Sequence, residues 1–165
     1  MAIDMYFKID GIPGEATAEG HKDSIKIETF TFGVHQVGGS QNTGKGLGAG
    51  RAEFQDVMVT KFVDKASPIL MENCAVGAHI AHALITVVKA DGTDKGAEYY
   101  TVKFTDLLVS SFANTGDEDK DSLTETVTLN YSKVVFTYKP QDNKGKLGGA
   151  ITRGYDIKEH KKVGG

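Results

Sequence analysis

Alternating apolar and polar residues are the main pattern along the chain, from its first residues onward. Ile3, Met5, Phe7 and Ile9 alternate with polar or charged neighbours, and a Gly-Ile-Pro-Gly turn follows at 11–14. Strict alternation of this kind is typical of a half-buried strand. We therefore predict a strand over residues 3–9.

The same kind of pattern predicts five further strands, over residues 24–36, 51–63, 80–89, 98–112 and 124–139. The phase of the apolar positions changes near Asp56 and again near Lys133. A β-bulge explains such a change, and burial of both faces is the alternative at Asp56. Asp91-Gly92 predicts a hairpin between two of these strands, and Pro140 ends the last one.

One segment has a helical pattern instead. Ser67 is placed as an N-cap, Pro68 follows at the first helical position, and Gly77 stands where a left-handed C-cap would lie. The apolar residues between them gather on one side: Ile69, Leu70, Met71, Cys74 and Ala75. We predict a short helix of about two to three turns.

Long antiparallel strands with bulges curl into barrels or into two packed sheets. Apolar residues occur on both faces at 107–109 and 134–136, more than one short helix can cover. A second sheet or another copy of the protein must cover the rest. We treat the 165 residues as a single domain, 1–165, whose tail, 141–165, has Ile151, Tyr155 and Ile157 as its anchors.

Composition argues against nucleic acid and membranes as partners. The net charge is −3, and the basic residues are not gathered into one patch, which argues against nucleic acid. No apolar run approaches the ~18 residues of a membrane span. The first residues lack the basic head and apolar core of a signal peptide. We expect a protein made in the cytoplasm that, if exported, uses no cleaved signal.

A glycine-rich loop spans residues 38–50 and contains Gly38, Gly39, Gly44, Gly46, Gly48 and Gly50. Its segment 39–45 matches the start of a phosphate-binding loop, but Gly46 stands where that motif needs Ser or Thr, and no helix follows. We interpret the segment as an extended loop, not as a nucleotide site.

The other motifs that suggest a metal site are incomplete. Residues 117–121 resemble the start of a calcium loop, but Ser122 and Thr128 replace its glycine and its final glutamate. Cys74, His79 and His82 fit no zinc spacing, and residues three apart on a strand face opposite ways. The sequence therefore predicts no catalytic residues, no metal and no cofactor, and that the protein is not an enzyme.

Several motifs together resemble the haemolysin-coregulated protein (Hcp) family over nearly the whole chain. They lie at residues 1–15, 54–56, 60–68, 107–111, 123–131, 138–141 and 154–156. The resemblance implies a mainly β fold: a β-barrel of two packed, mostly antiparallel sheets with one short flanking α-helix. It also implies homohexameric rings that stack as the inner tube of the type VI secretion system.

The resemblance further implies partners and residue roles. The partners are other copies of the chain, a spike protein at the tube tip, a contractile sheath and effector proteins carried in the ring. The loop at 38–50 is expected to reach the adjoining ring. Thr29 and Thr31 are expected to face the ring lumen, because their side of the strand is polar and uncharged; an ordinary exterior face is the alternative. Rival functions are a monomeric β-barrel that binds a small ligand and a hydrolase that uses His79 or His82.

Overall fold

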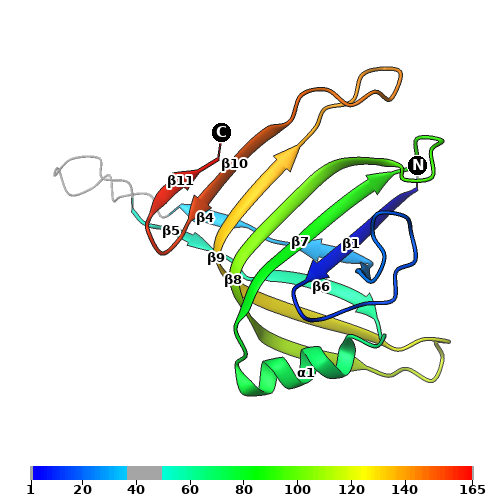
Figure 1. Cartoon of the computed structure of the whole chain (residues 1–165). Coiled ribbons are helices and arrows are strands. Elements are labelled where there is room, and N and C mark those ends of the chain that lie inside the picture. Colours follow the sequence, from blue (N-terminus) through cyan, green and yellow to red (C-terminus); the bar gives the residue numbers. More distant parts are fainter. Residues whose placement is uncertain (1, 37–49, 165) are drawn as a thin grey trace.

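The computed structural model describes residues 2–36 and 50–164, and these form a mainly β fold with one short helix (Figure 1). The strands are β1 (Ile3–Ile9), β2 (Ile25–Ile27), β3 (Thr29–Thr31), β4 (Val34–Gln36), β5 (Ala52–Phe54), β6 (Val57–Phe62), β7 (Ile80–Lys89), β8 (Ala97–Thr115), β9 (Thr124–Tyr138), β10 (Ile151–Asp156) and β11 (Lys161–Val163). The helix α1 (Ser67–Val76) lies between β6 and β7. The predicted fold class is confirmed.

The strands form a curved antiparallel sheet that closes on itself. Its main path runs β11-β10-β9-β8-β7-β1-β2, while β6 pairs with β9 and β3 pairs with β6. The chain passes directly from β2 to β3 through a bend at Glu28, whose N–H donates to the carbonyl of Thr60 at 2.8 Å. Residues 25–31 therefore join the two ends of the sheet, and β8 and β9 are long enough to run through both layers.

The bend at Glu28 corrects the prediction of one continuous strand over 24–36. This segment is three short strands, because β2 pairs with β1, β3 with β6 and β4 with β5. The strand predicted over 51–63 is also divided, because β5 pairs with β4 whereas β6 pairs with β3 and β9; the change near Asp56 is a break between two strands and not a bulge within one. The register of β8 against β9 shifts between Val109 and Ser111, and not at Lys133, which pairs with Thr105.

The helix has the predicted C-terminal cap but not the predicted N-cap. Gly77 adopts the left-handed conformation (φ 63°), and its N–H bonds back into the last turn. Ala66, not Ser67, is the N-cap residue, and no side chain caps this end. The Ser67 hydroxyl is occupied elsewhere: it donates to Oε1 of Glu125 at 2.7 Å and accepts from the Asp64 N–H at 3.0 Å.

The barrel interior is filled with apolar side chains. Phe7, Ile85, Phe104 and Leu129 are almost fully buried, and Leu70 of α1 joins the same cluster. The tail is more regular than predicted, because β10 pairs with β9 and β11 with β10. Of its three predicted anchors, Tyr155 stacks on Phe54 and Ile157 packs against the core, whereas Ile151 is exposed.

Candidate functional site

One face of the sheet, formed by β3, β6, β9 and the last part of β8, carries a set of hydroxyl side chains. Two cross-strand rows follow from the register. The first row is Thr29, Thr60, Thr126 and Ala113, and the second row is Thr31, Met58, Thr128 and Ser111. The residues between them, such as Val59 and Val127, are buried in the core. We call the two rows, together with Asp56, Ser110 and Asn130, the hydroxyl face.

Hydrogen bonds connect neighbours on this face. The Oγ1 atoms of Thr29 and Thr60 lie 2.5 Å apart, and Oγ1 of Thr128 contacts the hydroxyls of Ser110 and Ser111 at 2.8 and 2.5 Å. Each hydroxyl is both a donor and an acceptor, so it can exchange these bonds for bonds to a partner. The hydroxyls of the two rows are therefore adaptable and carry no charge.

Asp56 is the only charged member of the hydroxyl face. Ser110 Oγ donates to its Oδ2 at 2.6 Å, and Asn130 Nδ2 donates to its Oδ1 at 3.0 Å. Behind it, burial and then the charge of Asp56 raise the pKa of Tyr131 to about 12. The Tyr131 hydroxyl donates to the carbonyl of Gln55 at 2.8 Å. These bonds hold the carboxylate against the break between β5 and β6.

The two predicted lumen residues, Thr29 and Thr31, are both exposed and both lie on the hydroxyl face. Their neighbours Thr60, Thr126 and Thr128 were not predicted from the sequence. Alternating threonines at 124–128 are visible in the sequence, but only the register shows that they continue the rows of β3. The hydroxyl face is thus assembled from four separate parts of the chain, on β3, β6, β8 and β9.

The glycine-rich loop falls almost entirely outside the described residues. Gly38, Gly39, Gly44, Gly46 and Gly48 lie there, so their predicted role stays a prediction. Gly50 is described and exposed, and its carbonyl accepts a hydrogen bond from the side chain of Gln36 at the end of β4.

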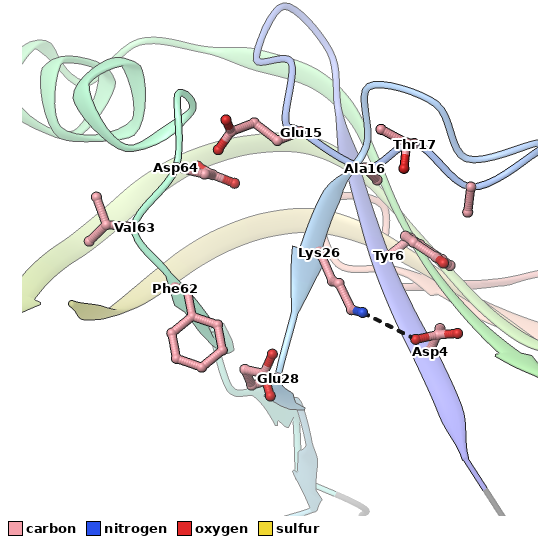
Figure 2. A pocket seen from close by; sticks show the side chains of 11 residues that line it. Asp4, Tyr6, Glu15, Ala16, Thr17, Lys26, Glu28, Phe62, Val63 and Asp64 are labelled. Atoms are coloured by element: carbon pink, nitrogen blue, oxygen red, sulfur yellow. Dashed lines mark ion pairs between the residues drawn. The ribbon is translucent and has the colours of Figure 1, made fainter. Parts of the chain in front are cut away.

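A groove of about 480 Å³ lies beside β1, β2 and the end of β6 (Figure 2). An ion pair joins Lys26 Nζ to Asp4 Oδ1 at 3.3 Å, and both side chains are more than half exposed. Glu15 and Asp64 line another part of the groove, and Phe62 supplies an apolar wall. The lining residues include no His or Cys and no member of the hydroxyl face.

The residues considered for metal binding or hydrolysis do not converge. Among residues 2–36 and 50–164, no three His, Cys, Asp or Glu side chains are arranged to hold a metal ion. Lys158 pairs with Asp106, to which His79 also bonds, and these contacts lower the pKa of Asp106 to about 2. His82 is exposed on β7, and Cys74 is half-buried on α1. Within the same residues, α1 is too short to cross a bilayer.

Comparison with known proteins gives a consistent result. The family model "Type VI secretion system effector, Hcp" matches residues 6–138. Protein hcp1 of Pseudomonas aeruginosa is 38% identical over 161 residues, which cover 97% of this chain and 98% of that protein. The major exported protein of the same organism is 25% identical over 138 residues, covering 80% of this chain and 78% of the relative.

Solved structures agree. A structure described as that of a type six secretion system protein has a TM-score of 0.90 and 32% identity, with 98% of this chain and 100% of that chain covered. Hcp1 from Salmonella typhimurium has a TM-score of 0.82 and 34% identity, with 99% and 100% covered. The family match, the curated relative and the shared fold all span most of the chain. This chain therefore belongs to the Hcp family, the secreted tube proteins of the type VI secretion system.

Proposed function

We propose that copies of this chain join side by side into homohexameric rings, that the rings stack into the inner tube, and that the hydroxyl face lines the lumen and contacts effector proteins. One observation carries the proposal. The two outermost strands of the hydroxyl face, β3 and the last part of β8, each have one edge that no described strand pairs with. The number six is the one that the family implies.

The two edges are different and lie on opposite sides of the hydroxyl face. Among the described strands, β3 pairs only with β6. On the other side, the last pair between β7 and β8 is Ile80 with Leu107, so residues 108–115 have β9 as their only strand neighbour within the described chain (Figure 1). Exposed edges are templates for pairing with another chain. Two unlike edges favour head-to-tail contacts, which give a ring when the rotation closes.

Closure of such a ring favours the hydroxyl face on the inside. The core and the second layer, with β7, β1 and β2, lie behind the other face of these strands. That bulkier side has more room on the outside of a ring. Thr29, Thr31, Thr60, Thr126 and Thr128 then line the channel, where neutral hydroxyls bind varied cargo weakly enough to release it.

The remaining assignments extend the same proposal. The loop with Gly38 to Gly50 reaches the adjoining ring, a spike protein binds the tip, and a contractile sheath surrounds the tube. The chain is held in the cytoplasm before it is exported. As an Hcp protein, it belongs to a family of structural tube subunits rather than enzymes. Among the described residues, the barrel interior is packed with apolar side chains, which favours the ring over a ligand-binding monomer.

Native mass spectrometry of the purified chain tests ring formation. A hexamer at micromolar concentration is expected, and a stable monomer would contradict the proposal. Thr31→Trp should keep the hexamer but retain less of a co-expressed effector, because a bulky side chain covers the hydroxyl rows. Ser122→Trp, at an exposed hairpin tip, is the matched control. Equal retention by both variants would exclude a lumen position for Thr31.

A deletion tests the loop separately. Removal of residues 39–48 should leave hexamers intact and abolish long tubes in electron micrographs, because the contact between rings is lost while the strand edges are kept. Loss of the hexamers themselves would overturn this division of roles.

A further inference from the structure

The helix α1 has apolar residues on its exposed side as well as on its buried side. Leu70 packs into the core, and Cys74 packs against it. Away from the core, Met71 is 54% exposed and Val76 69% exposed, and at about 3.6 residues per turn they flank Glu72 on the helix surface. Ile69, Ala75 and Val76 are also exposed, and Glu72 is the only charged residue of the helix. We call Ile69, Met71, Ala75 and Val76 the outer helix side.

This pattern is unusual for a helix that stays in water. A surface helix normally turns charged and polar residues to solvent, and a helix that is apolar all round is buried. Isolated apolar residues on a surface need no explanation, but here four of them lie on one short helix. The outer helix side is therefore expected to be covered in the assembled protein.

The position of α1 indicates what covers it. The helix contacts β8 and leads through Gly77 into β7, whose first residue, Ile80, pairs with Leu107. Residues 108–115 of β8, the unpaired edge, begin at that point, so α1 flanks the edge (Figure 1). Any strand that pairs with this edge brings the rest of its own chain next to the helix.

We propose that the outer helix side is a docking surface for the neighbouring copy of this chain, engaged when the β3 side of that copy meets residues 108–115. The inference rests on the proposed ring and adds an interface to it. The partner is a second copy because the surface is continuous with the open strand edge. The single charge at Glu72 gives no pattern that would select a strongly charged partner.

The double variant Met71→Glu/Val76→Glu tests the inference. It buries two carboxylates in the proposed interface while leaving the core unchanged. The concentration for half-assembly, measured by light scattering after chromatography, should rise by about ten-fold or more. Ala90→Glu, an exposed residue at the far end of β7, is the control and should assemble like the wild type. Circular dichroism checks that both variants are folded.

The outcomes separate the two proposals. A wild-type hexamer with an unchanged double variant would overturn the docking surface and leave the ring intact, and loss of binding to another tube component alone would do the same. A monomeric wild type would overturn the ring itself. If the double variant does not fold, Met71→Ser removes apolar area without adding charge. It must still raise the half-assembly concentration, or the inference is wrong.

Discussion

Lys61 and Glu125 face each other across β6 and β9 on the core side of the sheet, and their side chains are 1% and 0% exposed. Lys61 Nζ also donates to Asp64 Oδ1 at 2.9 Å and to Ser67 Oγ at 3.3 Å. Oε2 of Glu125 has no partner among the described residues. Removal of one buried charge leaves the other buried without its counter-charge, which is destabilising. Replacement of both by apolar side chains often leaves the stability of the fold unchanged.

Glu125→Leu alone is therefore expected to lower the free energy of unfolding by about 3 kcal/mol, and Lys61→Met/Glu125→Leu to recover most of that loss. Urea unfolding at one fixed protein concentration measures both. The exposed ion pair between Lys26 and Asp4 is the control, since Asp4→Leu should lower the free energy of unfolding by less than about 1 kcal/mol. A double variant as unstable as the single one would show that the charges stabilise the fold.

Asp106 links stability to acid pH. Hydrogen bonds from Lys158, His79 and Ser132 lower its pKa from 3.8 to about 2 in the folded chain. A lowered pKa means that folding favours the charged carboxylate, so this stabilisation is complete above about pH 4 and is lost as the pH falls through about 2. In Asp106→Asn the side chain does not titrate, so the variant lacks this pH-dependent stabilisation.

The melting temperature of the wild type should consequently exceed that of Asp106→Asn near pH 5, and the difference should shrink as the pH approaches 2. Asp94→Asn, an exposed residue in the turn between β7 and β8, serves as the control. A difference that stays constant over this pH range would mean that the charge of Asp106 does not stabilise the fold.

Among the elements, α1 depends on the conformation of the residue that ends it. Gly77 has a φ of 63°, and a Cβ placed there would meet nothing within 4 Å. The cost of Gly77→Ala is therefore one of backbone conformation alone, about 1 kcal/mol. Gly149→Ala is the matched control, because that glycine is equally open and needs no positive φ. Equal melting temperatures for the two variants would contradict the role of Gly77.

The elements also show where sequence patterns suffice. The strands at 3–9 and 80–89 have the predicted bounds, because local alternation or continuous burial defines them. The prediction of one strand over 24–36 was wrong, because the breaks in this segment depend on which strands its parts pair with. Ser67 was wrong as an N-cap because a distant residue, Glu125, engages its hydroxyl. Thr29 and Thr31 were found as a polar face, but their neighbours on β6 and β9 required the register.

At the scale of the whole molecule, a fully buried apolar core is combined with a surface that has unpaired strand edges and exposed apolar residues. The barrel buries its own apolar residues, so the chain can fold before it assembles. Unpaired strand edges lie at β3 and at residues 108–115, and exposed apolar residues lie on the outer helix side. Assembly of copies through these three regions satisfies strand edges and apolar surface together. It also leaves the hydroxyl face uncovered.

Backbone hydrogen exchange should report this division directly. In rings, amides of residues 29–31 and 108–115 should exchange more slowly than in the Met71→Glu/Val76→Glu variant diluted below its half-assembly concentration, because a neighbouring strand hydrogen-bonds or shields them in the ring. Amides of β7 should not change, since this strand already lies between β1 and β8 in a single copy. Protection limited to α1, with both strand edges exchanging as in the monomer, would mean that copies meet through side chains alone. In that case the sheet does not continue from one subunit to the next, and the lumen is lined by separate four-stranded panels rather than by one closed barrel.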